Sequence, residues 1–195
     1  VMNVEFDITP KSKRARRIDW LRNGVLGGVD VTEHELVFVT NGSLVENSSW
    51  GDHHTPAKFL PVVRDGGSWH LWRNIAAQDP SLGRPDKFCT TPEQTQWESA
   101  TVTALDERIP AYIENIAKRG TRTGRVVTGG IVTARDSSWL MSWTVSRQPH
   151  FAKQPDNQTV IWVYALFTDV LGDYVKKSMR NCTGEEITQE WLFQM

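Results

Sequence analysis

The sequence predicts an α+β fold, a mixed α/β arrangement in which hairpins build a β-sheet and a few helices cover it. Residues 138–146 alternate apolar and polar side chains with the period of a strand. Residues 159–167 are apolar almost throughout, which is typical of an inner strand. Helix-start signals near Asp106 and Thr183 precede apolar positions at helical spacing.

The chain opens with a predicted hairpin. Apolar and polar residues alternate over 4–8, which indicates a strand that ends at Pro10. A second strand over 17–22 would pair with it across the basic run 11–17. Such a run also resembles a phosphate-binding or nuclear-localisation segment. Because the formal net charge is only −1, an exposed hairpin tip is the preferred interpretation.

A compact apolar run, 36–39, predicts a strand over 35–40 that is buried on both faces. It leads into Thr40, Asn41, Gly42 and Ser43. Buried strands that end in small polar residues often carry ligands in α/β sheets, because backbone amides there can approach a phosphate. Taken without further context, one Asn-Gly pair favours a plain turn.

Residues 46–90 read mostly as loop, with one short helix over 69–77. Thr91, followed by Pro92, predicts the start of another brief helix. The neighbours His53 and His54 suggest a metal ligand pair, but no carboxylate-rich motif accompanies them. We therefore predict no metal site.

Further along, residues 99–103 predict a strand, and Asp106 is expected to cap the helix that follows it. That helix has an apolar stripe and should stop at 119–120; the stripe comprises Ile109, Tyr112, Ile113 and Ile116. Thr183 and Glu186 form a capping box that starts a last helix. Its predicted buried side comprises Ile187, Trp191 and Leu192.

The central hairpin joins a strand over 126–133, with a bulge at Gly129-Gly130, to the strand over 138–146 through a turn at 135–137. Residues 147–150 then leave the sheet at a proline and bring an arginine and His150 near the hydroxyls of Thr144 and Ser146. Such a group of donors suits a carboxylate or another small anion. On chemistry alone, an ordinary solvated strand end is the preferred interpretation.

This hairpin and four other segments resemble the oleate hydratase family, also called the myosin-cross-reactive antigens. The other segments are 27–43, 97–103, 159–169 and 182–192. The resemblance covers nearly the whole chain. It implies an FAD-containing lyase of fatty acid metabolism, which adds water to the cis-9 double bond of oleate or linoleate and gives a 10-hydroxy fatty acid.

The resemblance also implies roles for individual residues. In the family, a T-x-N-R-Q-P-H segment holds the fatty acid carboxylate; Thr144 and His150 match it, and Ser146 replaces the asparagine. Serine is shorter and offers one donor where asparagine offers two. Flavoproteins with two dinucleotide domains place a comparable strand and turn against FAD, so Thr40 to Ser43 are expected at the cofactor.

Family members are much longer and begin with a glycine-rich dinucleotide fingerprint, whereas no G-x-G-x-x-G occurs in this sequence. The catalytic glutamate and tyrosine proposed for the family lie upstream of the part represented. We therefore interpret residues 1–195 as a single internal segment, without the N-terminal FAD motif and a C-terminal helical part. We expect it to contain no catalytic residue and to be inactive alone.

Composition adds few constraints. The near-neutral charge offers no argument for nucleic acid. Two cysteines, Cys89 and Cys182, are too few for a disulfide scaffold, and no export signal or membrane span is evident. A cytoplasmic location is the expectation. For the intact enzyme, a peripheral membrane contact and a homodimer stay open.

Two alternatives remain. One is a non-catalytic module that takes a lipid or a sugar on a surface rich in tryptophan, of which the chain has nine. The other is redox catalysis by the flavin, which a test with a nicotinamide cofactor would reveal.

Overall fold

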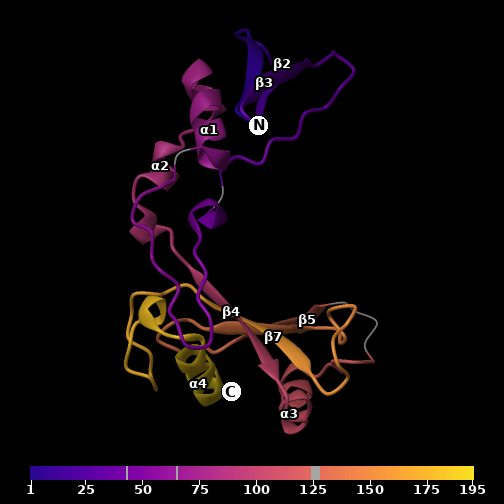
Figure 1. Ribbon diagram of the computed structural model, residues 1–195, viewed down its shortest axis with the longest axis vertical. Helices are drawn as coiled ribbons and strands as arrows, with labels where there is room; N and C mark the ends of the chain where they lie inside the picture. Colours follow the sequence, from indigo (N-terminus) through magenta and orange to yellow (C-terminus); the bar gives the residue numbers. More distant parts are fainter. Residues whose placement is uncertain (43, 65, 124–127) are drawn as a thin grey trace. The chain divides into compact units, whose positions relative to one another are not determined.

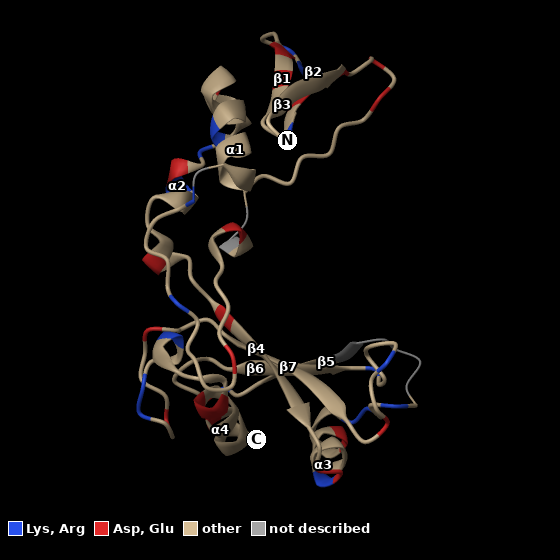
Figure 2. Ribbon diagram, in the orientation of Figure 1, with Lys and Arg blue, Asp and Glu red and all other residues tan. Residues whose placement is uncertain are grey.

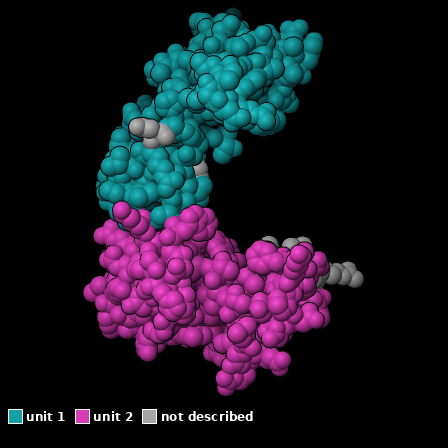
Figure 3. All heavy atoms as spheres, viewed as in Figure 1, with its two compact units in different colours: residues 1–49, 59–96 teal, residues 50–58, 97–195 magenta. Residues whose placement is uncertain are grey.

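The computed structural model describes residues 1–42, 44–64, 66–123 and 128–195. It combines helices with antiparallel sheets, which confirms the predicted α+β class (Figure 1). The chain forms two compact units. The first comprises Val1–Ser49 and Phe59–Gln96, and the second comprises Trp50–Lys58 and Trp97–Met195 (Figure 3).

The first unit contains a three-stranded antiparallel sheet in the order β1-β2-β3. Its strands are β1 (Asn3–Ile8), β2 (Lys13–Arg22) and β3 (Val25–Asp30). The predicted hairpin is confirmed, but β2 starts at Lys13, so most of the basic run lies within the strand and not in the turn. Arg16 of that run pairs with Glu5, and the Arg17 guanidinium lies 2.9 Å from Asp19 and 2.8 Å from Asp30. Carboxylates of the sheet therefore offset part of the basic charge of β2 (Figure 2).

Strand β3 was not predicted, although its turn carries a signal. Asn23 and Gly24 connect it to β2 and have φ values of 51° and 78°. Two consecutive residues with positive φ form the tight turn that Asn-Gly favours in hairpins. The dipeptide was therefore a local signal for this second hairpin.

The strand predicted over 35–40 is wrong. The segment is irregular, with Leu36 83% exposed and Phe38 91% exposed. A strand needs a neighbour for its backbone N–H and C=O groups, and no described residue pairs with this segment. Apolar composition alone did not supply one.

The predicted short helix is α1 (Gly67–Gln78), and it packs on β1. Two amide side chains attach it: Asn74 donates to the Met2 carbonyl and Gln78 to the Val4 carbonyl, both at 2.8 Å. The unit also contains a short α-helix, α2 (Asp86–Cys89). Its 3-10 helices, within the described residues, are η1 (Leu44–Asn47), η2 (Pro80–Leu82) and η3 (Pro92–Gln94). The last is the predicted brief helix after Thr91, although the Thr91 side chain makes no capping bond.

The second unit contains a four-stranded antiparallel sheet in the order β4-β7-β6-β5. Its strands are β4 (Glu98–Ala104), β5 (Thr128–Thr133), β6 (Ser142–Ser146) and β7 (Thr159–Ala165). The inner position of β7 and the β5–β6 hairpin confirm the predictions. The pairing shifts between Thr128 and Ile131, where Gly130 has φ 81°, as expected for a bulge. The predicted residues 126–127 of this strand lie outside the described part of the chain.

Strand β6 begins at Ser142, later than predicted. Leu140 has a φ of 50°, so the chain turns before the ladder starts. Trp139 and Met141 keep apolar positions in this turn and are fully buried. The alternation in the sequence thus predicted the buried residues correctly, but it predicted a longer strand than β6.

Helices α3 (Arg108–Ala117) and α4 (Gly184–Gln194) cover one face of this sheet, and a 3-10 turn, η4 (Met179–Asn181), precedes α4 (Figure 1). The Asp106 carboxylate accepts the Arg108 N–H at 2.9 Å, and both bonds of the Thr183 capping box are present. The core includes Ile113 of α3, Trp143 of β6, Val163 of β7 and, on α4, Ile187 and Trp191.

The prediction for the buried side of α4 is partly wrong. Leu192 is 46% exposed, whereas the carboxylate of Glu190 is fully buried. Glu190 accepts the backbone N–H groups of residues 173–175, each at 2.9 Å. Nothing in the sequence indicated this burial, because the loop at 173–175 meets α4 only in the folded chain. No helix in the described part of the chain is long and apolar enough to cross a bilayer.

Candidate functional site

The candidate site lies on the face of the second sheet that α3 and α4 leave uncovered, which we call the Thr144 face. It is defined by the alternate residues Ser142, Thr144 and Ser146 of β6 and Val160, Trp162 and Tyr164 of β7. Their neighbours in sequence, such as Trp143 and Val163, point into the core. Strand periodicity therefore places the hydroxyls of Thr144 and Ser146 and two aromatic rings on one face, whereas Ser142 is buried against Thr133.

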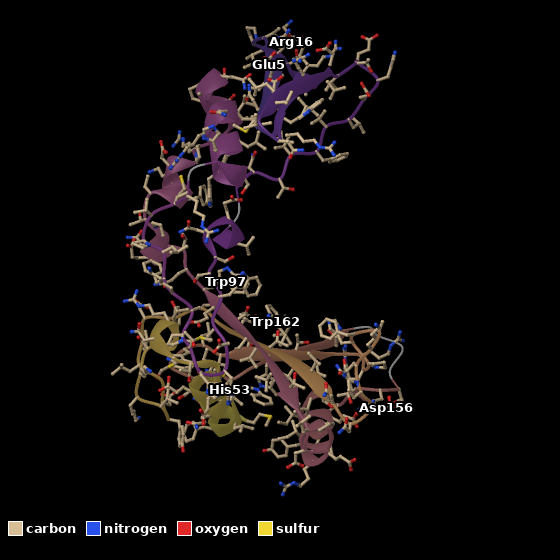
Figure 4. The ribbon with its side chains drawn as sticks, in the orientation of Figure 1. Glu5, Arg16, His53, Trp97, Asp156 and Trp162 are labelled. Atoms are coloured by element: carbon tan, nitrogen blue, oxygen red, sulfur yellow. The ribbon has the colours of Figure 1, made fainter. Side chains whose placement is uncertain are left out.

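Trp162 occupies the middle of this face. It is the cross-strand partner of Thr144 on β6 and of Thr101 on β4. Its ring stacks on Tyr164 with centroids 4.7 Å apart and meets Trp97 edge-on at 6.5 Å (Figure 4). Trp97 is 37% exposed and Trp162 is 38% exposed, so the aromatic surface is accessible. Rings beside hydroxyls can contact an apolar chain that ends in a polar head.

Thr144 and Ser146 are brought together, side by side on β6. The Thr144 hydroxyl donates to the Gly130 carbonyl at 2.6 Å. A hydroxyl has one hydrogen to donate, so Thr144 must rotate away from Gly130 to bind a carboxylate. The Ser146 hydroxyl has no hydrogen-bond partner within the ranges that the structure describes.

His150 lies in the loop that follows β6, and its side chain is exposed. Its ring meets Phe151 edge-on with centroids 4.8 Å apart, and its backbone N–H donates to Gln154 at 2.8 Å. Among the described residues, no hydrogen bond joins the imidazole to either hydroxyl. His150 is therefore an exposed imidazole in the loop that follows the strand carrying Thr144.

Gln148 is the residue that sequence reasoning missed here. Its side chain is 4% exposed and bonds to both neighbours of the loop: Nε2 donates to the Ser146 carbonyl at 2.6 Å, and Oε1 accepts the Val160 N–H at 3.1 Å. The same oxygen accepts from Gln154 at 2.6 Å. Gln148 thus attaches the His150 loop to β7. A polar residue next to the cis proline Pro149 was the only local signal.

The predicted cofactor residues lie in the first unit. Thr40 and Asn41 are exposed, and Ser43 lies outside the described residues. Gly42 has φ 52°, and a Cβ there would lie 2.5 Å from the ring of Trp69, so its role is close packing on α1. Within the described part of the chain, Thr40, Asn41 and Gly42 follow no strand, so the strand end that was expected before them is absent.

Glu98, on β4, has a carboxyl pKa well above its ordinary value. Burial raises its pKa to about 7. It shares the core side of β4 with Ala100 and Val102, and it interacts with Cys182, whose pKa burial raises to about 12. Glu98 therefore faces away from Thr144. Cys182 and Cys89 are both free and buried, which makes them inert thiols.

The sequence profile of the MCRA family matches residues 1–195. The chain therefore belongs to the MCRA family, which confirms the resemblance noted above. It is 42% identical over 196 aligned residues to an oleate hydratase of Streptococcus pyogenes serotype M49 (strain NZ131), across 100% of this chain and 33% of the relative. It is 32% identical over 182 residues to a linoleate hydratase of Lactiplantibacillus plantarum, across 91% of this chain and 32% of the relative.

The chain thus spans about a third of the length of these curated relatives. Both relatives are named as hydratases of unsaturated fatty acids. A fatty acid has the two chemical parts that the Thr144 face can contact, an apolar chain and an anionic head.

Proposed function

We propose that the protein containing this chain is an FAD-containing fatty acid hydratase that adds water to the cis-9 double bond of oleate or linoleate and yields a 10-hydroxy fatty acid. The observation that carries this proposal is the 42% identity to an oleate hydratase, which extends over the whole chain. Hydration of an alkene is acid–base chemistry, in which a proton goes to one carbon and water adds to the other. Groups outside this chain would supply the acid and the base.

This chain would hold the substrate. The hydroxyls of Thr144 and Ser146 and the imidazole of His150 are the proposed carboxylate ligands, and Trp162 would contact the adjoining hydrocarbon. Anchoring the carboxylate fixes one end of the substrate and so limits which carbon of the double bond meets the acid. The segment therefore contributes to where water is added, and we expect no hydration from it alone.

The proposed FAD would be bound mainly by parts of the protein outside this chain, in a fold with two dinucleotide domains. Thr40, Asn41, Gly42 and Ser43 are proposed as additional contacts. FAD would act structurally or electrostatically, because hydration leaves the redox state of the substrate unchanged. We further propose that the protein is located in the cytoplasm. A peripheral membrane contact and a homodimer would be properties of the intact enzyme.

The test is an assay of the full protein with oleate under anaerobic and aerobic conditions, with the product analysed by mass spectrometry. A hydroxy fatty acid heavier than oleate by the mass of one water molecule, about 18 mass units, supports the proposal. Oxidation of a nicotinamide cofactor with no hydrated product would identify a flavin oxidoreductase and contradict it.

The alternative function is a non-catalytic module for a lipid or a sugar. The partly exposed rings of Trp97 and Trp162 favour it, because sugars also stack on such rings. Titration with oleate and with a panel of glycans, followed by tryptophan fluorescence, separates the two. A response to glycans alone would select the sugar-binding module.

A further inference from the structure

Three metal-ligating side chains meet at the start of α4, away from the Thr144 face. His53, His54 and Glu185 each offer one ligand atom, and these atoms lie within 4.8 Å of one another. All three side chains are exposed. The sequence showed the histidines but no carboxylate partner, because Glu185 comes from a helix far along the chain.

Backbone hydrogen bonds hold the histidine loop on the helix. The Gly184 N–H donates to the Asp52 carbonyl at 2.9 Å, and the Glu185 N–H donates to the His53 carbonyl at 3.0 Å. A Cβ at Gly184 would lie 2.9 Å from the Asp52 carbonyl oxygen and 3.1 Å from the His53 Cα, so the close approach depends on glycine. The main chains that carry His53 and Glu185 are thus joined directly.

Asp52 holds the loop at 52–55 in one conformation. Its carboxylate accepts the N–H groups of His54 and Thr55, both at 2.9 Å, and its own N–H donates to the Thr55 carbonyl at 2.9 Å. These bonds fix the backbone of the residues that carry the two imidazoles.

The side chains need only small rotations to close on an ion. The two imidazole centroids are 4.6 Å apart at an interplanar angle of 73°. Ligand atoms at about 2.0–2.2 Å around one tetrahedral Zn²⁺ lie about 3.4 Å from each other. Exposed side chains can make up this difference by changing rotamer.

We propose that His53, His54 and Glu185 bind a divalent transition metal ion, of which Zn²⁺ is the best match, with water as the remaining ligand. Two imidazoles and a carboxylate are the donor set that Zn²⁺ takes up in proteins. The ion clips the loop at 52–55 to α4. Because it binds only when both elements are in place, it stabilises the folded unit. This inference is independent of the proposed hydratase function.

The experiment is calorimetric titration of the full protein, first stripped with a chelator, with Zn²⁺. Wild type is expected to bind an ion with micromolar affinity, and His53→Ala and Glu185→Gln should each weaken that affinity by about 10-fold or more. The matched control is His34→Ala. His34 is an exposed imidazole 3.6 Å from Glu33, but no third ligand accompanies this pair among the described residues.

Thermal melting provides a second readout. Zn²⁺ should raise the melting temperature of wild type and of His34→Ala, and it should leave His53→Ala unchanged. Equal melting temperatures without metal would show that the exposed substitutions preserve the fold. The proposal is overturned if wild type, His53→Ala and Glu185→Gln bind the same number of ions with the same affinity.

Discussion

Trp162 lies directly opposite Thr144 in the pairing of β7 with β6. Cross-strand partners on one face hold their Cβ atoms about 5 Å apart. The hydroxyl that is proposed to bind a carboxylate and the ring that is proposed to contact the hydrocarbon are therefore fixed together by the sheet. For His150 to bind the same carboxylate, its loop must bring the imidazole toward Thr144.

Removing two proposed carboxylate ligands tests the anchoring role. In the full protein, Thr144→Ala combined with His150→Ala should raise the KM for oleate about 10-fold or shift the position of hydration, because hydrogen bonds to a charged group contribute about 1.5–3 kcal/mol. Thr91→Ala is the control, since Thr91 is exposed in the first unit and its side chain makes no capping bond. Unchanged kinetics and an unchanged product would remove Thr144 and His150 from the site.

Trp162→Ala tests the contact with the hydrocarbon. Loss of buried apolar area weakens binding by about 25 cal/mol per Å². We therefore expect the KM for oleate to rise several-fold and the KM for a short unsaturated acid to rise less. Trp50→Ala serves as control, because Trp50 is 92% exposed. The same loss for both chain lengths would argue against an acyl contact at Trp162.

Gln148→Leu tests whether the His150 loop is attached through the buried amide. The substitution leaves the Val160 N–H and the Ser146 carbonyl without their partner, which costs about 1–3 kcal/mol of unfolding free energy. Chemical denaturation measures the loss. Gln94→Leu, on an exposed side chain, should change stability little. Equal stability of the two variants would contradict the attachment.

Glu190→Ala should be among the most destabilising single changes in the second unit. It leaves three partly buried N–H groups without an acceptor, and we expect a loss of about 3 kcal/mol. Glu190→Gln should lose less, because an amide retains one acceptor oxygen. Gln189→Ala on the exposed side of α4 is the control in thermal melting. A neutral Glu190→Ala would disprove the role of this carboxylate.

Glu98 makes stability depend on pH. Its pKa rises from 4.5 unfolded to about 7 folded, so the folded state holds the proton more tightly. Stability is therefore highest below pH 4.5 as far as this group is concerned, falls as pH rises toward 7, and stays lowered above it. Allowing for partial exposure to water, the penalty is about 2 kcal/mol.

Glu98→Gln should remove this penalty. Urea unfolding would then show the variant more stable than wild type at pH 8 and closer to wild type at pH 5. Glu93→Gln, an exposed carboxylate in the first unit, is the control. A difference between Glu98→Gln and wild type that is the same at both pH values would show that Glu98 is not the titrating group.

Local sequence determined much of the secondary structure and the candidate hydroxyls. Alternation placed Thr144 and Ser146 on one face of β6, and the Thr183–Glu186 capping box marked the start of α4. Both depend on residues close together in the chain, where spacing alone sets geometry. The family was likewise evident from the sequence, and the match to the MCRA family confirmed it.

Tertiary structure decided what depends on distant partners. The apolar run at 36–39 found no neighbouring strand, so its composition did not make it a strand. Glu190 could be buried because a loop presents three N–H groups to it, and Glu185 reached His53 because α4 docks on that loop. Burial and pairing are properties of contacts made across the fold, and neither spacing nor composition contains them.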